Sequence, residues 1–388
     1  MTDLHTTDLD DTAALDLLSE LVAIDSSNPD LVPGAAGETA IADHVGSWLA
    51  DRGFTVHRLE ARPGRPSIVA VAAGTGGGRS IMLNGHLDTV TLAGYDGDPL
   101  TPELRDGKLF GRGTYDMKSG LAASMVAAAR AVREPLPGDV ILTLVADEEY
   151  ASAGTEEVLQ QFSADGAIVV EPSGLELTLA HRGFVWLDVT VEGVAAHGSR
   201  PDLGVDAITL AGRFLVRLGE LQDRLAGGPR HPTLDTGSVH ASVISGGEEL
   251  SSYPARCTIS IERRTVPGET AAVVEGELRE ILDDLAGADP TFRYSLTTGL
   301  ERMPFEAPRK AGIVRTMLSV VPEVTGQPAV IRGEPFWTDC ALLAEAGIPC
   351  VLFGVDGGGA HAAVEWVDLD SYAAVISVLT RAITDFCS

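Results

Sequence analysis

The stretch Ile81-Met82-Leu83-Asn84-Gly85-His86-Leu87-Asp88 is the clearest indication of fold class in this chain. It opens with a short apolar run, which predicts a buried strand, and a glycine, a histidine and an acid follow directly. Ligands of α/β proteins bind at the carboxyl ends of the strands. We therefore expect His86 and Asp88 to belong to a functional site. The simpler alternative is a buried histidine with satisfied hydrogen bonds and an acid in an ordinary turn.

The same arrangement, an apolar run followed by polar residues, occurs four more times along the chain. The polar clusters are residues 111–120, 147–150, 171–173 and 354–361. Acids make up 56 of the 388 residues, so the triplet Asp147-Glu148-Glu149 is expected about once by chance and only its position is informative. Carboxylates and imidazoles at one sheet edge are ligands for a borderline divalent metal, with zinc the first candidate. Because no cysteine is among them, an open catalytic site is favoured over a structural zinc site.

Outside these clusters, predicted strands and helices alternate, which is typical of an α/β layer. We expect helices at 10–22, 37–51 and 118–133, and buried strands of a parallel sheet at 68–72, 81–83, 140–145 and 167–170. Near residue 180 the pattern changes to strands at 184–191, 238–244 and 256–263 with helices at 206–225 and 270–285. It then returns to α/β, with helices at 313–320, 340–346 and 369–386 and strands at 329–331 and 350–353. The sequence predicts a catalytic domain split into residues 1–179 and 296–388, with an α+β domain inserted at 180–295.

The composition narrows the classes of function. With 28 Lys+Arg against 56 Asp+Glu, the formal net charge is -28. This argues against nucleic acid and anionic membranes as partners, because both attract clustered basic residues. The four cysteines form no CxxC pair, so zinc-finger and thioredoxin-like sites are excluded. The N-terminus is acidic, and no apolar run reaches the ~18 residues of a membrane span. We expect a cytoplasmic protein with reduced thiols.

Six motifs, in order along the chain, carry a resemblance to a known family. They are GHLDTV (85–90), GRGTYDMKSG (111–120), DEEYASAGT (147–155), EPS (171–173), AAHGSRPDLGVDAI (195–208) and GAH (359–361). Together they resemble the acetylornithine deacetylase and succinyl-diaminopimelate desuccinylase group of dizinc amidohydrolases, which includes aminoacylase and glutamate carboxypeptidase relatives. The resemblance implies an α/β, zinc-peptidase-like catalytic domain with a mixed central sheet flanked by helices. It also implies that the inserted α+β domain is a ferredoxin-like lid and dimerisation domain.

The resemblance further implies a site with two divalent metal ions, Zn²⁺ first and Co²⁺ or Mn²⁺ as alternatives. In that reading Asp116 bridges both ions, His86 and Glu171 complete one, and Glu149 and His361 complete the other. Glu148 is then the general base, and Asp88 accepts a hydrogen bond from the imidazole of His86. The charges agree, because two Zn²⁺ bring about +4 while three carboxylates and a hydroxide bring about −4. As simpler alternatives, Asp116 caps the helix that begins near Lys118, and Glu171 and His361 are ordinary loop residues.

Four residues are candidates for contact with the substrate. By resemblance, His197 reaches the active site of a partner subunit and stabilises the oxyanion there. Arg264 is placed to bind a substrate carboxylate, although the neighbouring Arg263 leaves the register open. Asp356 stands where relatives have glycine, and it either supports the metal site, selects a substrate amine or is a harmless loop substitution. Trp337 is either a core residue or a wall of the substrate pocket.

These observations predict a metal-dependent hydrolase that cleaves the amide bond of an N-acyl-L-amino acid, as acetylornithine deacetylase does. The enzyme alternative is a carboxypeptidase or dipeptidase of the same group, since the catalytic motifs are shared. A non-catalytic metal-binding protein is the third reading, and it conflicts with the presence of Glu148 and all five ligand positions. We expect a small-molecule substrate and a homodimer, because His197 would act on a partner subunit.

Overall fold

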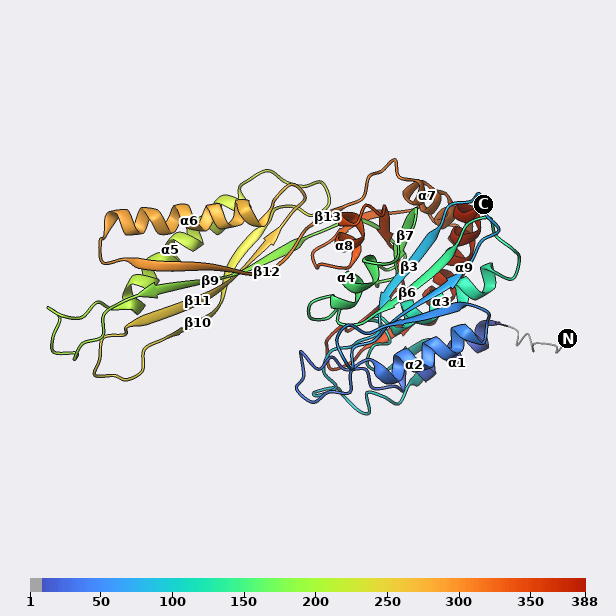
Figure 1. The fold of residues 1–388 in the computed structure, drawn as a ribbon, viewed down its shortest axis with the longest axis horizontal. Helices are drawn as coiled ribbons and strands as arrows, with labels where there is room; N and C mark the ends of the chain where they lie inside the picture. The colour runs from blue at the N-terminus through green and yellow to red at the C-terminus, as the bar shows by residue number, and fades with distance from the viewer. Residues whose placement is uncertain (1–8) are drawn as a thin grey trace. The chain divides into compact units, whose positions relative to one another are not determined.

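The computed structural model describes residues 9–388, so the acidic N-terminal segment noted above lies outside the described residues except for its end. The chain divides into two compact units (Figure 1). The first contains the chain up to Leu179 together with Ala307–Arg332 and Thr338–Ser388, and the second contains Ala180–Glu306 and Gly333–Trp337. No helix among the described residues combines the length and the apolarity that crossing a bilayer requires.

The largest sheet has nine strands and is mixed, as expected. Its order is β1 (Thr55–Leu59), β2 (Ser67–Ala72), β6 (Val140–Val145), β3 (Ile81–His86), β7 (Gly166–Val169), β15 (Cys350–Leu352), β8 (Leu177–His181) and β13 (Phe305–Glu306), with β14 (Ile331–Glu334) also paired to β8. The four neighbours β6, β3, β7 and β15 run parallel. Every residue of β3, β6 and β7 is buried, which explains their continuous apolar runs.

Two details of the predicted sheet were wrong. The strand predicted at 68–72 is antiparallel to its neighbour β6. Only residues 73–80 connect β2 to β3, and a crossover between parallel strands needs a dozen residues or more, so β2 and β3 run in opposite directions. Because β3 is parallel to β6, β2 is antiparallel to β6. The strand predicted at 329–331 begins only at Ile331 and continues to Glu334. There, pairing with β8 rather than apolar character sets the limits of the strand.

Seven helices belong to the first unit, in the part of the chain that the structure describes. They are α1 (Asp11–Val22), α2 (Thr39–Ala50), α3 (Lys118–Ala131), α4 (Ala153–Leu159), α7 (Gly312–Thr325), α8 (Cys340–Glu345) and α9 (Leu369–Cys387). Helix α3 packs against α9, α1 and the central strands, and all its residues except Arg130 are buried. Gly120 in its first turn has no room for a side chain, because the carbonyl oxygen of Val170 lies against it. This close contact holds the start of α3 beside the end of β7.

A small sheet joins two distant parts of the chain and was not predicted. Its strands are β16 (Gly357–Gly358), β17 (Trp366–Asp368), β5 (Lys108–Phe110) and β4 (Glu103–Arg105), in that order. Trp366 pairs with Phe110, so the loop after β5 and the loop before β17 lie side by side. The first of these loops carries Asp116 and the second carries His361.

The second unit is an antiparallel sheet of β10 (Ser238–Gly246), β11 (Arg256–Thr265), β9 (Gly183–Glu192) and β12 (Arg293–Arg302), in that order. Helices α5 (Ala207–Ala226) and α6 (Ala271–Ala288) pack on one face (Figure 1). The alternating residues of β9, such as Val189 and Val191, form a core with Phe214 and Leu282. Strand β12 was not predicted, because its alternation of exposed and half-buried residues leaves no fully apolar face.

Candidate metal centre

Three neighbouring strands deliver the first group of candidate ligands. His86 is the last residue of β3, Glu148 and Glu149 follow β6, and Glu171 follows β7. Because these strands are parallel and adjacent, their carboxyl ends meet at one edge of the sheet. All four side chains are buried or nearly so in this part of the first unit.

His86 lies at the centre of this group. Its Nε2 atom is 3.2 Å from Oδ1 of Asp116, 3.5 Å from Oε1 of Glu171 and 4.0 Å from Oε2 of Glu148. Two sets of ligand atoms lie close enough to share an ion: His86 with Glu148 and Glu171, and His86 with Asp116 and Glu149. Both Glu148 and Asp116 therefore lie within reach of an ion held by His86.

Asp116 connects the two histidines of the site. Its Oδ1 atom faces His86, while its Oδ2 atom is 3.4 Å from Nε2 of His361. The same His361 atom is 3.0 Å from Oε2 of Glu149. One carboxylate thus presents one oxygen to each half of the site, which is the arrangement that a bridging ligand requires. Asp116 does not cap α3, whose N-cap position is Met117.

The carboxylates are poorly compensated by protein groups alone. Burial, followed by the charge of Asp116, raises the pKa of Glu149 to about 7. Burial and the charge of Glu171 raise the pKa of Glu148 well above its usual range, and burial also raises that of Glu171. Hydrogen bonds to Asp116 and Glu149 raise the pKa of His361 to about 10. A concentration of negative charge that protonates its own histidines is a strong site for a cation.

The residues present fit divalent metal ions. Oxygen and nitrogen ligands sit ~2.0–2.2 Å from zinc, which places them roughly 3.3 Å from one another in a tetrahedral site. The contacts of 3.0–3.5 Å among His86, Asp116, Glu171, Glu149 and His361 match that spacing. In addition, Oε1 of Glu149 is buried without a hydrogen-bond partner. A buried carboxylate oxygen with no donor is costly unless a cation faces it.

The prediction that the Asp88 carboxylate accepts a hydrogen bond from His86 was wrong, because the main-chain oxygen of Asp88 takes that place. Nδ1 of His86 lies 2.8 Å from the main-chain oxygen of Asp88, but 3.7 Å from its Oδ1. The carboxylate instead accepts the backbone N–H groups of Glu148 at 3.1 Å and Glu149 at 3.2 Å. The loop after β6 comes close enough for this because β6 is the neighbour of β3. Asp88 therefore orients His86 through its main-chain oxygen, and Glu148 and Glu149 through its carboxylate.

Asp356 is exposed at the edge of the first unit. Its Oδ1 accepts the N–H of Gly357, and its main chain is held by Ser371 and Asp368. The carboxylate lies near Gly174 in the loop that follows Glu171. Among the described residues, the Asp356 carboxylate makes no contact with a predicted metal ligand.

The three remaining candidates lie in the second unit. His197 is exposed, and its Nδ1 is 2.8 Å from Oγ of Ser199. Trp337 is half-buried, donates its indole N–H to the carbonyl of Met303 and packs edge-on against Phe184. It is thus part of a packed aromatic cluster, and contact with substrate stays a prediction.

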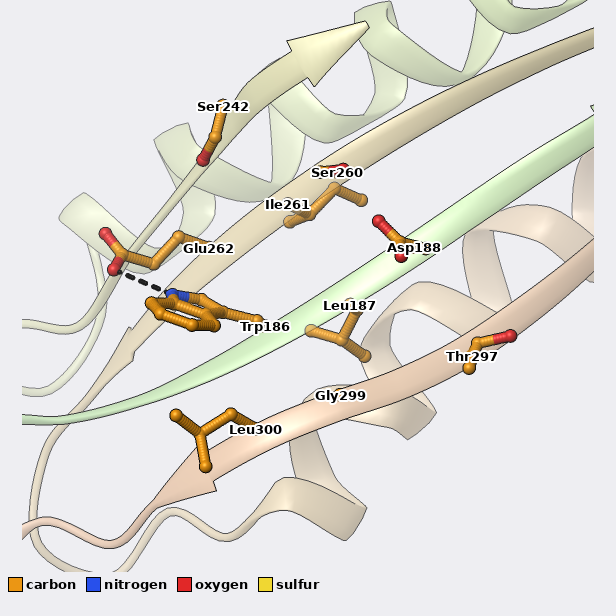
Figure 2. Close-up of a pocket in the computed structure, with 10 residues that line it drawn as sticks. All are labelled: Trp186, Leu187, Asp188, Ser242, Ser260, Ile261, Glu262, Thr297, Gly299 and Leu300. Atoms are coloured by element: carbon orange, nitrogen blue, oxygen red, sulfur yellow. Dashed lines mark hydrogen bonds between the residues drawn. The ribbon is translucent and has the colours of Figure 1, made fainter. Parts of the chain in front are cut away.

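The structure separates the roles of Arg263 and Arg264. Arg263 is fully buried, and its guanidinium group binds Glu269 at 2.6 Å and Glu277 at 3.2 Å. Arg264 is partly exposed on the face of the sheet opposite the helices, where it pairs with Glu262 at 2.9 Å. Glu262 also accepts the indole N–H of Trp186 at 3.2 Å beside a shallow pocket on this face (Figure 2). Only Arg264 can reach a ligand.

Two buried polar residues near the metal ligands, Asp339 and Asn28, were not predicted from the sequence. Asp339 is fully buried, burial raises its pKa to about 6, and its charge in turn raises the pKa of Glu148. Asn28 donates to Asp88 at 2.7 Å and to Asp147 at 3.1 Å, so it links the β3 and β6 loops. No local signal distinguishes either residue, because burial is decided by distant segments.

Comparisons with known proteins agree with this geometry. A model of peptidase family M20/M25/M40 matches residues 82–385. Acetylornithine deacetylase of Myxococcus xanthus is 30% identical over 385 residues, covering 95% of this chain and 96% of the relative. N-formyl-4-amino-5-aminomethyl-2-methylpyrimidine deformylase of Bacillus subtilis (strain 168) is 27% identical over 391 residues, covering 92% and 91%. In fold, the chain is similar to the aminopeptidase PepT of Bacillus cereus, with a TM-score of 0.82, 19% identity and coverage of 98% and 99%.

Proposed function

Because the chain belongs to peptidase family M20/M25/M40 and is thus a metal-dependent hydrolase, we propose that it hydrolyses the amide bond of an N-acyl-amino acid. Two relatives that are similar across nearly the whole chain are deacylases by name, one an acetylornithine deacetylase and the other a deformylase. Both reactions release an amine from a small acyl group. The proposed substrates are therefore amino acids whose amine carries a short acyl group.

The observation that carries this proposal is Asp116, which presents one oxygen to each of two histidine-containing groups. We assign His86 and Glu171 to one metal ion, Glu149 and His361 to the other, and Asp116 to both. Two such ions, Zn²⁺ first, would polarise the scissile carbonyl and lower the pKa of the attacking water. The donor set contains only imidazole and carboxylate, which zinc, cobalt and manganese all accept.

Glu148 moves the proton in this mechanism. Its carboxylate is nearly buried within 4.0 Å of Nε2 of His86, and the raised pKa makes it a stronger base than an ordinary carboxylate. It accepts a proton from the attacking water and returns it to the leaving amine. Its own backbone N–H is fixed by Asp88, so base and ligand keep their separate directions. His197 would stabilise the oxyanion, Arg264 the substrate carboxylate and Asp356 a substrate amine.

A substrate panel tests the proposal. The protein loaded with Zn²⁺ or Co²⁺ is assayed on N-acetyl-ornithine, N-succinyl-diaminopimelate, an N-acyl-methionine and simple dipeptides. We expect turnover of at least one acylated amino acid well above that of the dipeptides. Hydrolysis of dipeptides alone would replace this proposal with the carboxypeptidase or dipeptidase alternative. Absence of bound metal by elemental analysis would remove the mechanism.

We also propose that the protein is a homodimer in which His197 acts on the partner's site. Strand β10 lies at an edge of the second unit's sheet and carries no Asp, Glu, Lys or Arg side chain. Val243 and Ile244 on this strand are 60% and 52% exposed, and α5 beside it exposes Val216 at 65%. An unprotected apolar strand edge is a surface that pairs with another chain.

Light scattering and complementation test the dimer. Co-expressed E148Q and H197A chains form mixed dimers, and each mixed dimer has one site with both residues intact. If His197 acts across the dimer, the mixture recovers about a quarter of wild-type activity, since half of the dimers are mixed. A fully active monomer, or a mixture as inactive as its parts, overturns the arrangement.

A further inference from the structure

Glu365 holds the loop that carries Asp116. Its side chain is 1% exposed, and its carboxylate oxygens accept three backbone N–H groups of this loop at 3.0 Å each: those of Gly113, Tyr115 and Asp116. Its main-chain oxygen accepts a fourth, from Gly111. A charged acceptor makes stronger hydrogen bonds than a neutral one. Most of the backbone donors between residues 111 and 116 therefore depend on this one residue.

Arg112 makes the reciprocal contact from the Asp116 loop. It is 2% exposed, and its Nη1 donates to Glu365 Oε2 at 2.8 Å. Its Nη2 donates at 2.9 Å to the carbonyl oxygen of Ala362, the residue after His361. Each loop thus sends one buried charged side chain to the main chain of the other.

The His361 loop needs such support. The side chain of His361 is 54% exposed, so packing does not fix it. Its backbone lies in the left-handed region, with φ of 60°, which is unfavourable for a residue other than glycine. The next loop residues, Ala362 to Val364, are exposed as well. Two hydrogen bonds hold the exposed residues after His361 to the rest of the first unit. Arg112 donates to the carbonyl oxygen of Ala362, and the backbone N–H of Asp96 donates to that of Ala363 at 2.7 Å, directly before the buried Glu365.

We propose that Arg112 and Glu365 are positioning residues that set the separation of Asp116 and His361, and so the affinity of the metal ion that Asp116, Glu149 and His361 share. The inference rests on the two-metal function proposed above. The other ion is affected less, because His86 and Glu171 come from the ends of β3 and β7 and are held by the sheet. Loss of the pair should therefore empty one metal position before the other.

Metal binding by E365Q tests this inference without relying on activity. Glutamine keeps the size of the side chain but loses the charge, and its amide N–H₂ would face backbone donors. After dialysis against a weak chelator, we expect wild type to retain two equivalents of Zn²⁺ and E365Q about one. The dissociation constant of the weaker ion should rise at least tenfold, as measured by competition with a chromophoric chelator.

The matched control is E269Q, which removes one of the two carboxylate partners of the fully buried Arg263 in the second unit. It should keep both ions, even if its melting temperature falls as much as that of E365Q. If E365Q does not fold, R112K replaces it, since lysine keeps a charge for Glu365 but cannot also reach Ala362. If the folded variant binds two metal ions with unchanged affinity, Arg112 and Glu365 are not positioning residues for the metal site. A wild type without metal overturns the proposed function instead.

Discussion

The imidazole of His86 is held by the main chain of Asp88 and not by its carboxylate. Nδ1 of His86 is 2.8 Å from the Asp88 carbonyl oxygen and 3.7 Å from Oδ1. A carbonyl can only accept, so Nδ1 carries the proton and Nε2 is left free for a metal ion. The carboxylate is thereby available for the N–H groups of Glu148 and Glu149.

Replacing Asp88 with alanine should disturb the residues after β6 more than His86. The carbonyl that orients His86 remains, but two backbone donors and Asn28 lose their acceptor. We expect metal affinity and kcat each to fall about 10- to 100-fold. D88N should be intermediate, because one amide oxygen remains. Metal titration and kinetics of both variants check this, and a D88A variant with wild-type values would contradict it.

Replacing Glu148 with glutamine should remove proton transfer and leave the metal site loaded. The assigned ligands are unchanged, so the metal content should equal that of wild type. We expect kcat to fall about 10³-fold, within the usual range for a general base. E156Q, an exposed acid on α4, is the control and should stay fully active. Activity of E148Q within a few-fold of wild type would assign the base elsewhere.

Arg263 and Arg264 should separate stability from substrate binding. R263M leaves Glu269 and Glu277 without their buried partner and should lower the free energy of unfolding by about 3 kcal/mol. R264M should leave stability nearly unchanged, because its pair with Glu262 is partly exposed. It should raise KM at least tenfold with little change in kcat. Equal KM values for R264M and wild type would exclude a substrate contact.

Metal removal should destabilise the protein more at higher pH. The raised pKa values of Glu149, about 7, and His361, about 10, mean that the metal-free folded chain holds protons that the unfolded chain has lost. Stability of the metal-free chain from these groups therefore falls as pH rises from about 4.5 towards 10. Metal binding also strengthens as its ligands lose protons.

Calorimetry of chelated and Zn²⁺-loaded protein at pH 5, 6.5 and 8 measures this effect. The difference between the two melting temperatures should widen steadily across the series. A constant difference would show that these side chains are not the ligands.

Asp339 should lower the free energy of unfolding of the metal-free protein at pH values above its pKa. Its pKa of about 6 lies above the ordinary 3.8, so the folded state resists its ionisation and stability from this group falls between those values. D339N keeps an oxygen for the hydroxyl of Thr155, which donates to Asp339 at 2.6 Å. We expect D339N without metal to be more stable than wild type by about 3 kcal/mol at pH 8 and by roughly half of that at pH 5, where the carboxyl group is already ionised in the unfolded chain. Lower stability of D339N at pH 8 would contradict this.

Much of the fold could be predicted from local pattern. Short apolar runs bounded by glycine, proline or acids predicted β2, β3, β6 and β7. Helical periodicity predicted α1, α2 and α5, and alanine content predicted α3. The runs worked because a strand buried on both faces must be apolar throughout. The edge strand β12 and the short strands β4, β16 and β17 were missed, because they contain mixed or very few residues and are defined by the strands with which they pair.

Local sequence is enough to identify which residue types follow the strands: His86 after β3, the acids after β6 and Glu171 after β7. That β6, β3 and β7 are neighbours, and that Asp116 faces both histidines, depends on how distant segments pack. The same packing buries Arg263 and not Arg264, and it turns the main-chain oxygen of Asp88 to His86 and the carboxylate to the loop after β6. It also brings Glu365 to a loop some 250 positions earlier in the chain. The physical reason is that strand-end chemistry is written locally, whereas burial and hydrogen-bond partners come from segments far apart in the chain.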